Sequence, residues 1–523
     1  MRVASRVPAN WRSRLPVTVT FALCLLPSLA SAQNSNRLAL FRQQHQKLRS
    51  EHLAALDRIA TFCRSQQLED GTRAVDAARR LTEQTGILAL ALPDEVTPEL
   101  SPDLPANQRQ WRSQLRTQKK RHAQSLFLLS RRVLKAGFTS MAFELVRETV
   151  ANDTDSTTAR RLLGFVRFGN RWVTPFASQQ LRRKHVWHDR FGWLPATHVE
   201  RYESGQRYFK RKWVAADREA ELRRDFRNAW EIRTDHYLVR TNHSLEEGVQ
   251  LANSLERFHR FFHASFAGFF KTPEQIRRLF DGTHRVSGRT ASRLTRPHVV
   301  HYYRDREEYR RMLRRRIPQI DITNGLYMPE DRIAHFFYGP IADAEFPRAT
   351  LFHEATHQLL YESQSRARPI ARDQDFWIVE GFACYMESFQ PGRLGESSDR
   401  IGSPRYVRFH WARHRVLEEN YYIPLRKFAS MGMRAFQNDP NITRNYSQAS
   451  GLAHFLMHHD GGRYRDALIE HLVQIYSPGR RLTIQSLAQL TGVDHATLDR
   501  QYRDYLARQQ SSLSDTNART PRQ

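Results

Sequence analysis

Hydrophobic residues recur every three or four positions along the first part of the chain, the spacing of an amphipathic helix. This pattern runs from 36 to about 92, and a proline-rich stretch, LPDEVTPELSPDLPAN, then predicts an extended connector. From 109 to 163 the helical spacing returns with a break at Gly137. It predicts two helices that resemble a single tetratricopeptide-type hairpin near 121–163, then a turn and a third helix.

Between 164 and 227 the pattern changes, and aromatic residues alternate with Gly, Pro or Asp. Segments such as GFVRFGNRWVTP and YFKRKWVAAD predict short strands joined by tight turns. Trp172-Val173 and Trp213-Val214 lie in similar contexts, which indicates a degenerate internal repeat. Exposed aromatic rings beside arginines can bind sugars or peptides, but the commoner role of such rings is to fill the core of a small β-module.

From 228 to 507 predicted strands and helices alternate. WEIRTDHYLVRTNH predicts a strand, and the following helix has a capping box of Ser244 and Glu247 at its start. HVVHYY predicts a strand, DREEYRRMLRRR a helix, and NGLYMPEDRIAHFFYG two short strands joined by a turn. After 507 the periodicity ends, and 508–523 is predicted to be a disordered tail. The expected fold class is α+β: a helical region over 33–163, a β-rich module over 164–227, and an α+β domain over 228–507.

The first residues resemble an export signal. Several arginines precede an apolar run, VTVTFALCLLPSLA, which ends in Ala30-Ser31-Ala32. A basic segment, a short apolar segment and a small-x-small site predict a signal peptide over 1–32, cleaved near Ala32-Gln33. A lipoprotein signal at Cys24 is excluded because Leu23 is too large for that cleavage pocket. We expect a periplasmic or secreted protein with no transmembrane segment in its mature chain.

The net charge indicates which partners the protein can bind, and the cysteine count indicates whether disulfides stabilise it. The 523 residues include 82 Lys and Arg against 54 Asp and Glu, a formal net charge of +28. Clusters such as Lys210-Arg211-Lys212 can meet an acidic polysaccharide or an anionic surface, whereas no nucleic-acid module is recognisable. After signal cleavage Cys63 and Cys384 remain, so we expect no disulfide framework and favour two buried thiols over a bridge between them.

The segment TLFHEATHQLLYES carries the sharpest chemical signal. Two residues four apart on a helix face the same way, so His353 and His357 can both present an imidazole to one zinc ion. Glu354 lies about a hundred degrees around the helix from His353, beside the ion. There it can act as a general base toward a water that the metal activates.

A third protein ligand is required, and DFWIVEGFACYMES offers Glu380. Its apolar neighbours predict burial, and a buried carboxylate without a partner costs several kcal/mol, so a metal partner is the simpler explanation. Glu387, seven residues on and on the same helical face, can orient a zinc-bound histidine, or it is a solvated glutamate.

HEATH followed by WIVEGFACYMES resembles the gluzincin metallopeptidases, in particular their aminopeptidase N branch and secreted relatives of unknown function. The resemblance covers about 230–507 and implies a thermolysin-like catalytic domain, one zinc ion per chain and a peptide or protein substrate. It also implies that His353, His357 and Glu380 are the zinc ligands and that Glu354 is the base. NYSQASGLAHFLMHH resembles a downstream helix of that branch, and by this resemblance Tyr446 stabilises the oxyanion.

One departure from the aminopeptidase pattern bears on the type of cleavage. The Gly-Ala-Met-Glu-Asn segment that holds a free amino terminus is missing upstream of His353, so endopeptidase action is somewhat favoured. The strand around 324–327, or the one around 332–338, is expected to be the sheet edge that pairs with substrate. Two alternatives remain: an exported, non-catalytic protein that binds a peptide or polyanion, and hydrolysis of a non-peptide amide or ester.

Overall fold

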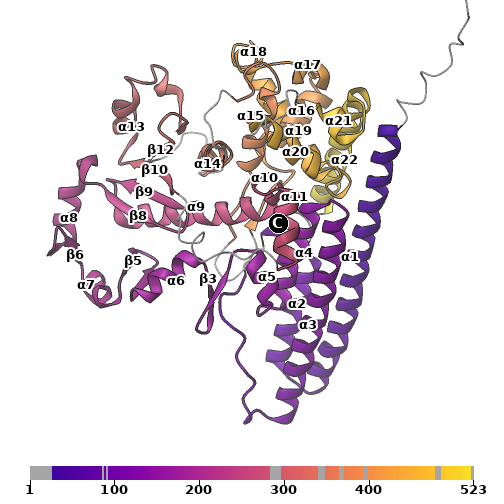
Figure 1. Cartoon of the computed structure of the whole chain (residues 1–523), viewed down its shortest axis with the longest axis vertical. Coiled ribbons are helices and arrows are strands. Elements are labelled where there is room, and N and C mark those ends of the chain that lie inside the picture. The colour runs from indigo at the N-terminus through magenta and orange to yellow at the C-terminus, as the bar shows by residue number, and fades with distance from the viewer. Residues whose placement is uncertain are drawn as a thin grey trace, which may run out of the picture.

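The chain forms a long helical arm, a row of small hairpins and a mixed α+β body (Figure 1). The computed structural model describes residues 26–84, 88–89, 92–282, 296–339, 348–363, 370–392, 399–476 and 484–519. The predicted signal peptide lies mostly outside these residues, since the description begins at Leu26. None of the described helices combines the length and apolar character that a membrane span needs.

The arm consists of five helices: α1 (Leu26–Ser65), α2 (Glu69–Glu83), α3 (Ala106–Lys135), α4 (Thr139–Asn152) and α5 (Thr157–Leu162). As predicted, the chain reverses between α3 and α4 at Gly137, whose φ of +95° is strained for any other residue. The helical pattern predicted as far as about 92 ends earlier, because α2 stops at Glu83 and a two-residue strand, β1 (Leu88–Ala89), pairs with β13 (Asp399–Arg400) of the body.

The predicted internal repeat is present as three similar units, each an antiparallel hairpin followed by a short helix. They comprise β2 (Val166–Phe168), β3 (Arg171–Val173) and α6 (Pro175–Arg182); β4 (His185–His188), β5 (Gly192–Pro195) and α7 (Val199–Glu203); and β6 (Gln206–Phe209), β7 (Lys212–Ala215) and α8 (Ala216–Arg223). The strands and tight turns were predicted, but the three helices were not.

The tryptophans of the units pack on the helix that precedes them in the chain. The pairs are Arg160 of α5 with Trp172 at 5.5 Å, Phe176 of α6 with Trp193 at 6.3 Å, Tyr202 of α7 with Trp213 at 6.1 Å, and Arg223 of α8 with Trp230 at 5.4 Å. Trp230 is the first residue of the sheet in the body. The packing of a tryptophan on a side chain of the preceding α-helix therefore repeats from the arm to the body.

The body contains a five-stranded mixed sheet with the order β11-β12-β10-β9-β8. Its strands are β8 (Trp230–Arg233), β9 (Tyr237–Thr241), β10 (His298–Tyr303), β11 (Leu326–Met328) and β12 (Ile333–Phe337). β10 runs parallel to both β9 and β12, and β11 is an antiparallel edge strand. The single strand predicted from Trp230 is wrong, because the chain turns between β8 and β9, where Glu256 accepts hydrogen bonds from Thr234 and His236.

Thirteen described helices cover or extend the sheet: α9 (Leu245–Ser265), α10 (Ala267–Phe270), α11 (Pro273–Phe280), α13 (Arg306–Leu313), α14 (Ala349–Glu362), α15 (Phe376–Met386), α16 (Val407–Leu417), α17 (Leu425–Ala429), α18 (Met433–Gln437), α19 (Ile442–His458), α20 (Arg465–Tyr476), α21 (Leu487–Thr491) and α22 (His495–Arg519). One hydrophobic cluster joins the sheet to these helices and extends from Trp230 to Leu506. The body is therefore a mixed α+β unit, as predicted. Ser244 caps α9 by accepting the Glu247 N–H, at 3.1 Å.

The arm and the body share buried side chains. The cluster that fills the arm around α3 and α4 also contains Ile276 and Phe280 of α11. Ser140 of α4 donates to Asp466 of α20 at 2.6 Å, and Glu144 pairs with Arg465. The predicted boundary near 163 is therefore crossed by a continuous apolar contact.

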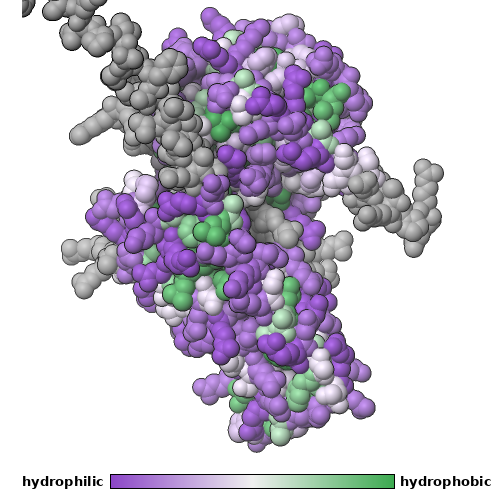
Figure 2. Space-filling model, turned by 90° about the vertical axis from the view of Figure 1, so that its right-hand side faces the viewer, coloured by the Kyte–Doolittle hydropathy of each residue, from purple (hydrophilic) through white to green (hydrophobic). Residues whose placement is uncertain are grey.

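The tail after 507 is helical as far as Arg519, where the sequence predicts disorder. Gln509 donates to Tyr505, one turn earlier on the same helix, at 2.9 Å and lies 3.4 Å from His454 of α19, so this part of α22 has a tertiary partner that no local periodicity reveals. The two described cysteines, Cys63 and Cys384, are buried and free, as favoured from the sequence. Figure 2 shows the face of the molecule that carries the arm. This surface is mainly hydrophilic, with small, separated apolar patches.

Candidate metal centre

Three helices bring the predicted site residues together. α14 carries His353, Glu354 and His357, α15 carries Glu380, and α19 carries Tyr446. α14 buries one apolar face against the body core. The two histidines lie at the edge of that face with side chains only 15% and 19% exposed.

The side chains of His353, His357 and Glu380 converge. The two Nε2 atoms of the histidines are 3.1 Å apart. Glu380 oxygens lie 3.5 Å from Nε2 of His353 and 3.8 Å from Nε2 of His357. Tetrahedral zinc ligands with bonds of 2.0–2.1 Å are about 3.3 Å from one another, so the three observed separations bracket the expected value.

His236, Glu256 and His259 form another group of side chains of the kind that binds metals. The angle between the two histidine rings distinguishes the two groups. The rings of His353 and His357 meet at 74°, so the in-plane lone pairs of both Nε2 atoms can point to one position. The rings of His236 and His259 are stacked at 3.7 Å with an angle of 18°. Lone pairs of stacked rings lie in two nearly parallel planes and do not meet at one ion.

The other nitrogen of His353 is held by Glu387. Nδ1 lies 2.8 Å from Glu387 Oε1, and Glu387 also accepts the Tyr406 hydroxyl at 2.8 Å. Arg408 of α16 donates to both oxygens, at 2.9 and 3.0 Å. Burial opposes ionisation, but Arg408 and His353 hold the pKa of the Glu387 carboxyl at about 2. An ionised acceptor at Nδ1 keeps the proton there and turns the Nε2 lone pair toward His357 and Glu380.

Cys384 was expected to be a buried thiol and lies within this group. Its thiol contacts His353, and it is one helical turn beyond Glu380 on α15. Burial is the largest influence on this thiol and raises its pKa. Cys384 is therefore a protonated neighbour of His353 on the side where Glu387 lies.

Glu354 faces the edge of the sheet. Its Oε2 accepts the backbone N–H of Tyr327 on β11 at 2.8 Å, and within the described part of the chain no other donor to this carboxylate is found. Gly325, just before β11, permits this approach, since a Cβ there would lie 2.9 Å from Thr350 of α14. One carboxylate oxygen of Glu354 is thereby fixed, and the other is available to a reacting molecule.

Tyr446 reaches the group from α19. Its hydroxyl hydrogen-bonds the Glu380 carboxylate, and its ring packs edge-on against Phe436 at 5.3 Å. Burial, followed by the charge of Glu380, raises the pKa of Tyr446, so the phenol remains a hydrogen-bond donor.

Gly381 explains the Glu-Gly pair on α15 in physical terms. A Cβ at this position would lie 2.5 Å from the carbonyl oxygen of Ala449 on α19, which is inside any real contact. The absence of a side chain lets α19 pack directly on α15. Gly381 thus brings the helix with Tyr446 close to the helix with Glu380.

Charge is distributed unevenly among the three convergent side chains. Burial disfavours the charged form of each. Hydrogen bonds to Cys384, Glu380 and Glu387 nevertheless raise the pKa of His353 well above its ordinary value. Hydrogen bonding to His353 lowers the pKa of Glu380, and burial lowers that of His357. Without a metal the cluster therefore holds one proton between anionic groups, at a place where a cation is favoured.

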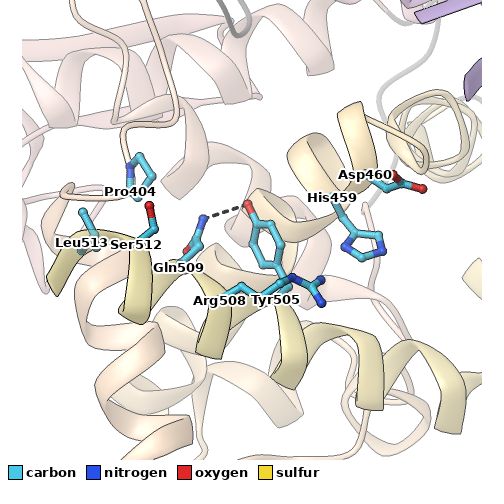
Figure 3. Close-up of a pocket in the computed structure, with 8 residues that line it drawn as sticks. All are labelled: Pro404, His459, Asp460, Tyr505, Arg508, Gln509, Ser512 and Leu513. Atoms are coloured by element: carbon cyan, nitrogen blue, oxygen red, sulfur yellow. Dashed lines mark hydrogen bonds between the residues drawn. The ribbon is translucent and has the colours of Figure 1, made fainter. Parts of the chain in front are cut away.

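A separate pocket of about 580 Å³ lies beneath α22 (Figure 3). Tyr505, Arg508 and Gln509 of α22 line one wall, and His459 and Asp460 line the opposite wall. Gln509 donates to Tyr505, and the ring of His459 stacks on Tyr464. No acid–base pair converges among these lining residues, so this pocket offers no catalytic group comparable with the cluster on α14 and α15.

Of the comparisons with known proteins, one found a match. A family model described as "Protein of unknown function (DUF1570)" matches residues 348–477. That span begins just before α14 and ends just after α20, and it contains all six predicted site residues. No curated protein and no solved structure matches the chain.

The sequence missed four contributors to this group. Cys384 could have been found, because it lies on the same face of α15 as Glu380 and Glu387. Tyr406 and Arg408 gave no signal, since they come from a different segment. The N–H of Tyr327 is a main-chain group and has no signature in the sequence.

Proposed function

We propose that the chain is a zinc-dependent peptidase of the gluzincin type, with one zinc ion held by His353, His357 and Glu380. The observation that carries this proposal is the convergence of two imidazole nitrogens and a carboxylate at separations of 3.1, 3.5 and 3.8 Å. Two histidines and one glutamate form a ligand set of catalytic zinc, which leaves a fourth position open.

The donor chemistry fits zinc for a second reason. His353 is oriented by an ionised carboxylate, the arrangement that commonly supports a histidine ligand. A metal ion at Nε2 of His353 would displace the proton that this nitrogen shares with Glu380, while the Nδ1 proton would stay in the bond to Glu387. A zinc ion in this position supplies Lewis-acid catalysis, polarising a carbonyl group and activating water.

The residues around the ligands have complementary roles in peptide hydrolysis. Glu354 accepts a proton as water adds to the scissile carbonyl carbon, and it returns this proton to the leaving nitrogen when the C–N bond breaks. Its bond from Tyr327 N–H keeps the carboxylate aimed at the cleft. Tyr446 donates a hydrogen bond to the oxygen that becomes negatively charged.

Endopeptidase action is the favoured form of this activity. The edge strand β11 borders the site and carries the N–H that contacts Glu354, so an extended peptide can lie along its open side. The missing Gly-Ala-Met-Glu-Asn segment, noted from the sequence, also disfavours binding of a free amino terminus. The export signal predicted over 1–32 gives the proposed setting, outside the cytoplasm.

Metal content and casein hydrolysis of the same samples test the proposal. We expect about one zinc per chain in the purified protein, lost in Glu380→Ala together with chelator-sensitive hydrolysis. His236→Gln is the matched control, because it removes a histidine from the cluster of His236, Glu256 and His259. It should leave zinc content and casein hydrolysis unchanged. Wild-type protein without zinc would overturn the proposal. Zinc without hydrolysis would favour the rival, a binding protein that keeps the site.

A further inference from the structure

The third hairpin unit exposes a group of aromatic rings. Tyr208 and Trp213 are opposite each other on β6 and β7, with ring centroids 5.2 Å apart. His198 lies 4.8 Å from Trp213 and 5.0 Å from Tyr208. Tyr208 is 41% exposed, and the other two side chains are partly exposed. The three rings lie close together at mutual angles of 54°, 58° and 68°, and they are termed the aromatic platform here.

The other two units do not present such a platform. In the first unit the tryptophan at this position, Trp172, is only 4% exposed and lies opposite an arginine. In the second unit Trp187 is opposite Trp193, and Trp187 packs against the main core. Trp187 and Trp193 are each partly exposed, like Trp213, so the third unit differs from the second by its exposed Tyr208.

Arg201 lies on the platform and three further cations lie at the tip of the same hairpin, where Lys212 points to the opposite face of β7 from Trp213. The Arg201 guanidinium lies 4.7 Å from the centroid of Trp213, and Lys210, Arg211 and Lys212 follow at the exposed hairpin tip. None of these four is found in an ion pair within the described residues. The whole module, 164–227, carries 15 Lys and Arg against 7 Asp and Glu, so its net charge of +8 favours an anionic partner.

The hairpin tip keeps its cations in an unfavourable backbone conformation. Lys210 and Arg211 form a two-residue turn in which both φ angles are positive, 45° and 68°. Turns of this kind strongly prefer Asn-Gly, because the left-handed region is strained for other side chains. The turn therefore presents two charges at a position where an uncharged pair would be more stable, and such local strain tends to occur at functional positions.

We propose that the aromatic platform and its cations bind an acidic polysaccharide. The flat apolar face of a sugar ring packs against Tyr208 and Trp213, and carboxylate groups on neighbouring sugars pair with Arg201 and the hairpin tip. The site is separate from the metal centre and would hold the protein on a polymer rather than take part in hydrolysis.

Binding of the full-length mature chain to immobilised polygalacturonate tests this inference. The key variant is Lys210→Asn with Arg211→Gly, which removes two charges and supplies the turn residues that this hairpin prefers. Tyr208→Ala removes the exposed ring. The charge-matched control is Arg182→Gln with Arg183→Gln, two exposed arginines at the end of α6 in the first unit.

We expect each of the first two variants to weaken binding by about tenfold, equivalent to about 1.4 kcal/mol, with a weaker effect at higher salt. The control should change binding by less than about twofold. Equal loss in the control, or no binding by the wild type, would overturn the proposal. If a single-stranded oligonucleotide binds more tightly than polygalacturonate and the same variants weaken its binding, the platform binds nucleic acid instead. Equal binding of a neutral polysaccharide would also overturn it.

Discussion

His353 Nδ1 lies 2.8 Å from Glu387 Oε1, and this bond determines which nitrogen of His353 faces the other ligands. Glu387 in turn receives bonds from Tyr406 and Arg408, so its carboxylate is fixed from several sides. The proposed ligand set therefore depends on residues that cannot touch the ion.

Glu387→Gln should weaken zinc binding by about 10–100-fold, because an amide can accept the Nδ1 proton but carries no charge to hold it there. Competition with a chromophoric chelator measures the change. Glu418→Gln is the control, since Glu418 also pairs with a histidine, His414 at 2.8 Å, outside the site. An unchanged affinity in Glu387→Gln would show that Glu387 has no role in holding the metal.

Glu354→Gln should lower kcat by about 10²–10⁴-fold, the range for loss of a general base. The side chain keeps its size and can still accept the Tyr327 N–H, so zinc content should remain at the wild-type level. Steady-state hydrolysis of a quenched peptide and metal analysis on the same preparation check both parts. Retained activity would exclude Glu354 as the base.

Tyr446→Phe should lower kcat by about 10²–10³-fold with little change in KM, since a lost oxyanion donor acts only as charge develops. The phenyl ring preserves the packing against Phe436. If zinc affinity falls while kcat of the fully loaded protein is unchanged, the hydroxyl serves Glu380 and not the reaction.

Gly381→Ala should destabilise the body by about 1–3 kcal/mol, because the new methyl group meets the Ala449 carbonyl at 2.5 Å and α19 must move away. Chemical denaturation followed by circular dichroism measures this. Gly268→Ala on α10 is the matched control, since its Cβ would make only an ordinary contact of 3.6 Å with Ile469. Equal stability of the two variants would contradict the close-approach argument.

Acid should weaken the helical arm through His52. Burial, and then the charge of His122, lowers the pKa of His52 from 6.5 to about 3. Between these values the unfolded chain binds a proton that the folded chain does not, so stability is complete above pH 6.5 and falls as the pH decreases toward 3. The loss is at most about 1.4 kcal/mol per pH unit.

Melting curves at pH 7.5 and pH 5 check this prediction. His52→Gln should reduce the difference between them, whereas His495→Gln, at a partly exposed position at the start of α22, should not. If the variant at His52 melts with the same pH dependence as the wild type, the buried histidine is not the source of acid sensitivity.

The sequence predicted those parts of the site that are local. His353 and His357 are related by the helical repeat, and Glu380 stood out because its neighbours are apolar. Arg408 and the Tyr327 N–H could not be predicted, because their contacts depend on how distant segments pack. The sheet order was similarly inaccessible, since β10 pairs with β9 and β12 across long stretches of chain.

The repeat was recognised at two tryptophans and missed at Trp193. This residue follows Gly192, whereas the other two follow a cation, so the short motif that relates Trp172 to Trp213 does not extend to it. The helix that continues beyond 507 was missed for a different reason: its contact with His454 of α19 is tertiary.

The row of hairpin units has a consequence for how such chains can vary. Each tryptophan contacts the helix immediately before it, from Trp172 on α5 to Trp230 after α8. An open array with nearest-neighbour contacts can gain or lose a unit, but the two ends of this row are also joined directly, because Ser140 of α4 donates to Asp466 of α20. The row therefore closes a ring with the arm and the body, and this closure fixes the number of hairpin units that fit between them.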